Sequence, residues 1–157
     1  MKGAILSKSG KYRYQLWRIW NPDKPLCLFI GLNPSTADSF DDDPTVKRLI
    51  YFAKKYGYGG FYIGNLYALR TSKPSVLFKS KKKIGKYNDE HLLEMYIKTK
   101  HIIIMWGSKK GIEKRVEAFF HMFKSTFLFY CFGHCKDGNP THPLFLPKNT
   151  KLIKYNL

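Results

Sequence analysis

Two asparagines and a histidine stand in turn-forming segments that follow apolar runs of this chain. The first asparagine, Asn33, follows the apolar stretch 26–30 and lies between Gly31 and Pro34. Glycine permits a tight turn and proline fixes one backbone dihedral angle, so the amide of Asn33 has little freedom. A constrained amide can hold a water molecule or the polar edge of a ligand at low entropic cost. The alternative is a turn in which Asn33 bonds only to its own backbone.

Three further polar segments follow apolar runs in the same way. Asn65 ends the run 61–65, Ser108 follows the run 102–106, and His142 lies in the turn-rich loop 138–143. If the strands are mostly parallel, their carboxyl ends are neighbours in one crevice, where open α/β sheets bind ligands. A helix N-terminus at this crevice would favour an anion, so a phosphate could bind there.

The apolar runs alternate with helical patterns along the chain. This rhythm predicts one three-layer α/β/α domain over residues 1–157, with a central, mostly parallel sheet of about four strands. The buried strands are expected at 26–30, 61–65, 102–106 and 127–132, beside an edge strand at 12–16 that is exposed on one face. One helix is expected to begin at Pro44 after an Asp43 cap, and another after an Asn88 cap. A third helix is expected around 112–123, and Lys73 to Lys86 is expected to be a basic connection.

Charge is the most informative total of this chain. Lysine and arginine number 28 against 11 acidic residues, a net charge of +17. Such a field attracts polyanions, and we expect DNA, single- or double-stranded, as the partner, with no membrane and no obligate protein partner. The alternative is a lysine-rich coding bias. The start 1–6 is too short for a secretory signal, and three cysteines fit a reducing compartment, so a cytoplasmic location is expected.

Four segments, taken in order, resemble motifs of the uracil-DNA glycosylase superfamily. They are Gly31-Leu32-Asn33-Pro34-Ser35, similar to its first loop, Asn65-Leu66-Tyr67-Ala68-Leu69-Arg70, similar to the strand end with the base-reading asparagine, Met105-Trp106-Gly107-Ser108, similar to Leu-Trp-Gly-Ser, and Thr141-His142-Pro143-Leu144, similar to the final His-Pro-Ser-Pro loop. Over most of its length the chain resembles a bacterial and phage family known as domain of unknown function 1643. That second family brings no established activity.

The glycosylase resemblance implies roles for individual residues. Asn65 would read an extruded base, Asn33 would orient water, and His142 would support the departing base. Asn33 stands where the commonest uracil enzymes have an aspartate, so the general base would be another carboxylate, for which Asp38 is the candidate. The resemblance also implies base contacts by Leu32 and Ser35 of the same loop. The expected nucleic-acid contacts are Arg70, Lys81, Lys82, Lys83, Ser108 and Lys109.

Two features of the first loop bear on the substrate. Ser35 stands in the region where the uracil enzymes carry an aromatic gate against the thymine methyl group. Phe40 interrupts the acidic segment next to the candidate pocket and could stack on an extruded base.

The sequence therefore predicts a DNA glycosylase-like enzyme, which hydrolyses the N-glycosidic bond of a uracil-type or C5-modified pyrimidine. No metal or organic cofactor is expected. The alternative is a non-catalytic nucleotide- or nucleic-acid-binding module on the same fold, which the missing aspartate in the first loop favours. A zinc site of Cys131, His134, Cys135 and His142 has suitable ligand types, although a buried thiol in a strand is ordinary.

Overall fold

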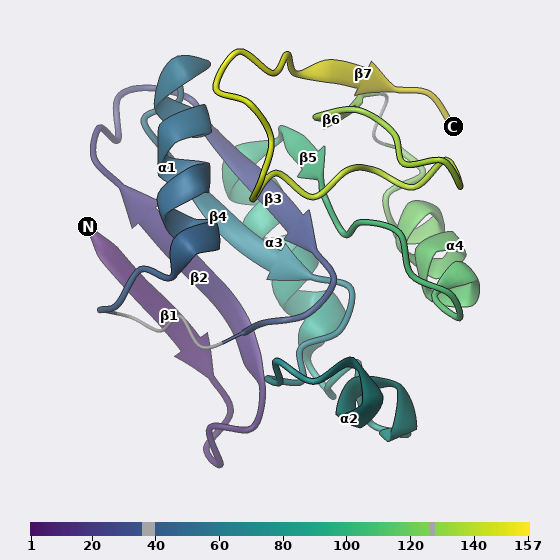
Figure 1. Ribbon diagram of the computed structural model, residues 1–157. Coiled ribbons are helices and arrows are strands. Elements are labelled where there is room, and N and C mark those ends of the chain that lie inside the picture. Colours follow the sequence, from purple (N-terminus) through teal and green to yellow (C-terminus); the bar gives the residue numbers. More distant parts are fainter. Residues whose placement is uncertain (36–39, 126–127) are drawn as a thin grey trace.

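The chain folds around one seven-stranded mixed sheet (Figure 1). The computed structural model describes residues 1–35, 40–125 and 128–157. In this part of the chain the strands are β1 (Lys2–Leu6), β2 (Arg13–Ile19), β3 (Leu26–Gly31), β4 (Gly60–Asn65), β5 (Ile102–Ile104), β6 (Phe129–Cys131) and β7 (Ile153–Tyr155). The helices are α1 (Pro44–Lys55), α2 (Pro74–Lys79), α3 (Asn88–Thr99) and α4 (Glu113–Met122).

Four strands at the centre of the sheet run parallel. The order is β1-β2-β4-β3-β5-β6-β7, and β3 pairs in parallel with both β4 and β5, while β5 pairs in parallel with β6. The expected parallel strands are therefore present. The described part of the sheet has seven strands rather than about four, because β1 and β2 at one side and β7 at the other add antiparallel pairs.

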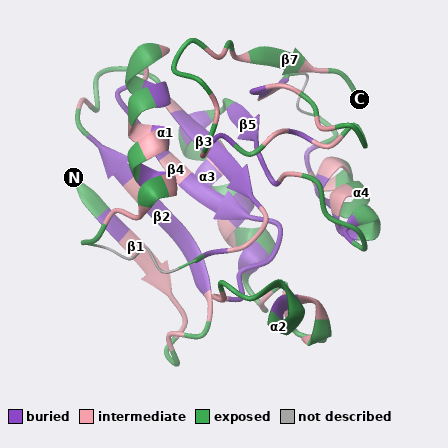
Figure 2. Cartoon of the chain, in the orientation of Figure 1, coloured by how far each residue is buried: buried purple, intermediate pink, exposed green. Residues whose placement is uncertain are grey.

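Both faces of the sheet are covered. Alternate side chains of β3 enter two separate cores: Leu28 and Ile30 pack with α3 and α4, whereas Phe29 packs with α1. Figure 1 shows α1 in front of the sheet and α3 behind it, and Figure 2 shows the strands between them as buried. The expected three layers are present in this sense. Because β3 is buried on both sides, its residues are almost continuously apolar.

The start of α1 is the expected one. Pro44 occupies the first turn, and the Asp43 carboxylate accepts a hydrogen bond from the backbone N–H of Val46 at 2.8 Å. A carboxylate at this position satisfies an N–H that has no partner within the helix. The Asp42 side chain beside it forms an ion pair with the buried Arg18 of β2, with Nε and Oδ1 2.7 Å apart. The sheet thus holds the segment that begins α1.

The expected edge strand is wrong in its position. β2 lies inside the sheet between β1 and β4, and six of its seven residues are buried. Its alternating polar residues are buried because distant groups bind them: the amide of Gln15 donates to His91 Nδ1 and to Glu94 Oε2, both at 2.9 Å. The two acceptors come from α3, far along the chain.

Other boundaries also differ from expectation. Asn88 is the first residue of α3 rather than its cap, and it is fully buried. The basic connection contains the short helix α2, and β5 ends at Ile104 rather than at residue 106. β6 begins at Phe129; residue 127, part of the expected strand, lies outside the described residues. Within the described ranges, no helix has the length and apolar character needed to cross a membrane.

Candidate functional site

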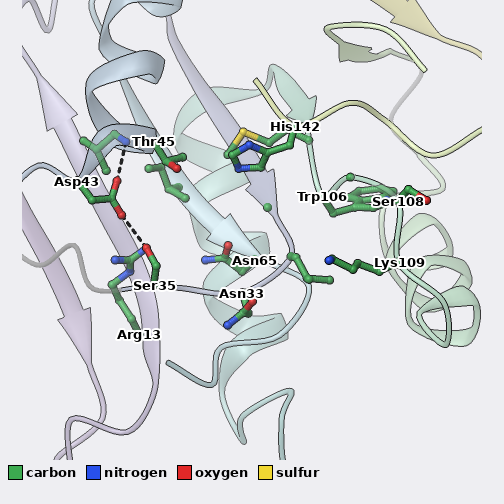
Figure 3. Close-up of a pocket in the computed structure, with 16 residues that line it drawn as sticks. Arg13, Asn33, Ser35, Asp43, Thr45, Asn65, Trp106, Ser108, Lys109 and His142 are labelled. Carbon is green, nitrogen blue, oxygen red and sulfur yellow. Dashed lines mark hydrogen bonds between the residues drawn. The ribbon is translucent and has the colours of Figure 1, made fainter. Parts of the chain in front are cut away.

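A cavity of about 430 Å³ opens where the parallel strands β3, β4 and β5 end (Figure 3). This is the edge at which open α/β sheets bind ligands. Its lining includes seven residues expected from the sequence to form the site: Leu32, Asn33, Ser35, Asn65, Ser108, Lys109 and His142. The structure therefore brings together segments that are more than 100 positions apart in the chain.

Hydrogen bonds between loops close one wall of the cavity. The indole N–H of Trp106 donates to Asn139 Oδ1 at 3.0 Å, and the backbone N–H of Gly107 donates to the carbonyl of Pro140 at 2.9 Å. The hydroxyl of Ser108 also bonds the Asp137 carboxylate. These contacts fix the loop after β5 against the segment that carries the candidate histidine.

Asn65 is the buried polar residue at the base of the site, with 4% of its surface exposed. Gly31, its partner in the adjacent strand, leaves room for this side chain, because a Cβ at position 31 would lie 2.8 Å from Asn65 Oδ1. The Asn88 side chain donates to the carbonyl oxygens of Asn65 at 2.9 Å and Leu66 at 3.3 Å. Figure 3 shows the amide of Asn65 between Asn33 and His142. The Asn88 bonds hold the backbone at Asn65, and the buried side-chain amide of Asn65 can present one donor and one acceptor to a ligand.

The side-chain amide of Asn33 is bound to the backbone. Its Nδ2 donates to three carbonyl oxygens: those of Pro34 at 3.2 Å, Leu69 at 3.2 Å and Thr71 at 2.8 Å. Both N–H groups are therefore used in joining the loop after β3 to the loop after β4. Asn33 can bind a water molecule only through its side-chain carbonyl oxygen. It is therefore less able to orient water than the sequence suggested.

His142 presents a defined face to the cavity. The backbone N–H of Leu144 donates to His142 Nδ1 at 3.2 Å, so the neutral ring carries its proton on Nε2. Loss of hydration lowers the pKa of the His142 imidazole below its ordinary value, and the negative charge of Asp43 partly opposes this shift. The ring is therefore neutral at pH 7 and offers Nε2–H as a donor.

Asp43 places a carboxylate in the cavity wall. Its Oδ1 caps α1, and its Oδ2 accepts a hydrogen bond from the hydroxyl of Ser35 at 2.6 Å (Figure 3). A carboxylate has about four lone-pair positions, so two remain for water or a ligand. Asp38, the carboxylate expected from the sequence, lies outside the described residues.

Arg13 is a cavity residue that the sequence did not single out. It opens β2, is 5% exposed and lines the same cavity as Asp43. Figure 3 shows its guanidinium beside Ser35. The sequence does show a cation within a strand pattern. Because one face of that strand was expected to be exposed, this arginine was not singled out.

Several expected contacts lie outside the cavity. Phe40 is 76% exposed, does not line the cavity, and its carbonyl accepts a hydrogen bond from Lys2 Nζ at 2.9 Å. Arg70 donates to the carbonyl of Gly10 at 3.0 Å. Lys83 Nζ lies 5.6 Å from the Tyr67 ring centroid. The two other lysines expected to contact nucleic acid, Lys81 and Lys82, are exposed.

The zinc ligand set considered above is not assembled. In the ranges that the structure describes, no group of three or more histidine, cysteine, aspartate or glutamate side chains could hold a metal ion. The His134 ring instead stacks on Tyr155 with centroids 5.2 Å apart. The Cys135 thiol faces the hydroxyl of Thr141 at 4.0 Å.

Comparison with known proteins gives one match. Residues 13–144 match the profile of the family described as "Protein of unknown function (DUF1643)". The match includes β2, the helices α1 to α4 and the cavity residues from Arg13 to His142. No curated protein and no solved structure matches the chain. The resemblance to domain of unknown function 1643 is thus confirmed, whereas none of these comparisons supports the resemblance to uracil-DNA glycosylases.

Replacing Asn33 tests whether its amide is structural. Asn33→Ala removes the donor to three carbonyl oxygens and should lower the free energy of unfolding by about 1–3 kcal/mol. Denaturant unfolding followed by circular dichroism measures this change. Asn149→Ala, at an exposed position, is the control and should leave the midpoint unchanged. Equal stability of Asn33→Ala and the wild type would contradict the structural role.

Replacing Asp43 tests the electrostatic coupling across the cavity. Asp43 raises the pKa of His142, so Asp43→Asn should lower that pKa further, while asparagine can still cap α1. An NMR titration of the His142 ring protons measures the pKa in both proteins. Asp23→Asn removes the same charge from an exposed loop and should not change it. A pKa of His142 that rises in Asp43→Asn would contradict the arrangement.

Proposed function

Because the chain belongs to the DUF1643 family, whose description assigns no activity, we propose its function from the chemistry of its cavity. The protein is a DNA glycosylase-like enzyme that accepts an extruded uracil-type or C5-modified pyrimidine and hydrolyses its N-glycosidic bond. One observation carries the proposal. A neutral histidine donor, a buried asparagine amide and a carboxylate line the same cavity, contributed respectively by His142, Asn65 and Asp43.

The lining of the cavity suits a pyrimidine. Its volume of about 430 Å³ lies in the range of small-molecule sites. Apolar side chains, among them Ile63, Met105 and Trp106, can cover the faces of a base. The Asn65 amide would then bond the polar edge, because one donor and one acceptor match the carbonyl and N–H of a uracil-type ring.

The proposed reaction is hydrolysis. The bond between sugar C1′ and the base nitrogen breaks, and the electron pair leaves with the base. His142 Nε2–H would donate a hydrogen bond to a base carbonyl oxygen, where negative charge develops. A water oxygen bonds to C1′, and its proton goes to the Asp43 carboxylate and then to solvent. The departed base anion takes a proton from solvent, so the products are a free base and an abasic sugar, and the scheme requires no metal or organic cofactor.

Asp43 takes the role for which Asp38 was the candidate. The hydroxyl of Ser35 and the N–H of Val46 both donate to it. These bonds fix its direction, which is what a group that orients water needs. Asn33 supports this site by holding the loop rather than by holding the water.

A non-catalytic nucleotide-binding module is the second candidate. It is favoured by Asn33, whose N–H groups are bound to three backbone carbonyls and cannot direct a water molecule. In this case the cavity would bind a base or nucleotide and leave the glycosidic bond intact. The two candidates share the same cavity, so only a chemical assay separates them.

The decisive experiment measures base release. Oligonucleotides that contain uracil, 5-hydroxymethyluracil or thymine are incubated with the protein, and abasic sites are detected by alkaline strand cleavage. The small Ser35 side chain should admit C5 substituents, so rates for uracil and 5-hydroxymethyluracil should agree within about a hundredfold. His142→Ala should slow release by about 10²–10³-fold, and Asp43→Asn by about 10²–10⁴-fold.

The control is His121→Ala, which removes an exposed histidine of α4 and should release base at the wild-type rate. If neither His142→Ala nor Asp43→Asn changes the rate of base release, the proposed mechanism is contradicted. Binding of the oligonucleotides without release of any base would favour the nucleotide-binding module.

A further inference from the structure

Two shallow hollows lie near the cavity; the first shares a lining residue with the cavity, and the second shares one with the first. The first is lined by Gly10, Lys11, Ser35, Arg70, Thr71, Ser72 and Lys73, and it shares Ser35 with the cavity. The second lies between the turn after β1 and the loop before α3, and it shares Lys11 with the first. One shared residue thus links the cavity to the first hollow, and another links the first hollow to the second.

The charge of this path is of one sign. Six cations line the two hollows: Lys8, Lys11, Arg70, Lys73, Lys82 and Lys86. None of the described residues that line either hollow is acidic. A set of cations whose hollows have no acidic residue in the described lining is complementary to a chain of phosphates, because each cation replaces a condensed counterion.

The second hollow also contains aromatic rings. Tyr12 and Tyr14 lie nearly parallel, with centroids 6.3 Å apart and 7° between their planes, and both line the hollow. Tyr87, 44% exposed, meets the edge of Tyr14 at 6.3 Å. Aromatic rings beside cations bind unpaired bases by stacking, whereas the bases of a duplex already stack on each other. This combination favours a single strand.

The floor of the path is fixed by hydrogen bonds. Arg70 donates through Nη1 to the carbonyl of Gly10, and its backbone N–H donates to the carbonyl of Lys11, both at 3.0 Å. The backbone N–H of Arg13 donates to the carbonyl of Ala68 at 3.0 Å. The turn after β1 is thus joined to the segment after β4 by hydrogen bonds within the chain.

From these observations we propose that the two hollows form a binding track for single-stranded nucleic acid that leads into the cavity. The track takes the backbone phosphates on its lysines and stacks unpaired bases on Tyr12, while one nucleotide enters the cavity past Ser35. This inference rests on the proposed function only in taking the cavity's ligand to be part of a nucleic acid. It also selects among the lysines of the basic connection, since Lys82 and Lys86 line the track and Lys81 and Lys83 do not.

The test compares two triple variants with equal loss of charge. Lys11→Ala, Lys73→Ala and Lys82→Ala together remove three track cations that are exposed. Lys114→Ala, Lys124→Ala and Lys136→Ala together remove three exposed lysines elsewhere. Affinity for a fluorescent single-stranded 12-nucleotide DNA is measured by anisotropy at several salt concentrations, with a duplex of the same sequence in parallel.

The track variant should lose at least about tenfold in single-strand affinity at low salt, and its log–log salt slope should fall by about two units. The control variant should retain the wild-type slope within one unit. Tyr12→Leu should weaken single-strand binding by about 5–100-fold without changing the slope; a thermal melt verifies that it is folded. Equal losses in both triple variants, or a duplex that binds as tightly as the single strand, would overturn the proposal.

The outcome is independent of catalysis. If the track variant loses affinity while the wild type releases no base, the track stands and the glycosylase proposal falls. If base is released and the track variant binds like the wild type, the glycosylase proposal stands and the track falls.

Discussion

The carbonyl groups at and beyond the end of β4 must be hydrogen-bonded although the chain leaves the sheet there, and this requirement organises the site. A buried carbonyl without a donor costs about 1–3 kcal/mol. Three side chains supply the donors: Asn33 bonds the carbonyls of Leu69 and Thr71, Asn88 bonds those of Asn65 and Leu66, and Arg115 Nε bonds that of Leu66 at 2.7 Å. Because Asn33 lies in the loop after β3, its bonds join the end of β3 to the loop after β4. Residues at both strand ends line the cavity, so these bonds hold part of its lining in place.

Electrostatics then divides this fixed cavity into parts with different chemistry. One wall holds the Asp43 carboxylate, bonded by Ser35, and the other holds His142, whose lowered pKa keeps its ring neutral. The arrangement separates an acceptor for water from a donor for a leaving group, which is the division of labour that hydrolysis of a glycosidic bond needs. Outside the cavity, six cations line the two hollows, and no described acidic residue lines them. The positive charge of the chain, +17 in total, is therefore not evenly distributed. The proposed activity and the proposed track are thus separate consequences of one sheet edge.

The local sequence predicted those features whose causes are local. The continuously apolar run of β3 and the Asp43-Pro44 start of α1 require only neighbouring residues, and both are confirmed. The burial of β2 was not predictable in this way, because Gln15 is buried only through His91 and Glu94, more than 70 positions away. Asn33 is a similar case: its sequence context indicated a constrained amide, but its carbonyl partners on the loop after β4 decide that the constraint is structural. That Asn65 and His142 line the same cavity followed from the parallel direction of the strands, which the sequence pattern predicted.

The central claim is that the cavity at this sheet edge is a base-binding site in which Asn65 and His142 touch the ligand and Asn33 does not. It is tested most directly by NMR of the labelled protein, titrated with a single-stranded oligonucleotide whose uracil-type base is joined to the sugar through carbon and cannot be released. The side-chain amide signals of Asn65 and the ring signals of His142 should shift, whereas the amide signals of Asn33 should stay, because its N–H groups remain on Pro34, Leu69 and Thr71. Shifts that are confined to residues outside the cavity, with Asn65 and His142 unchanged at saturation, would contradict the account.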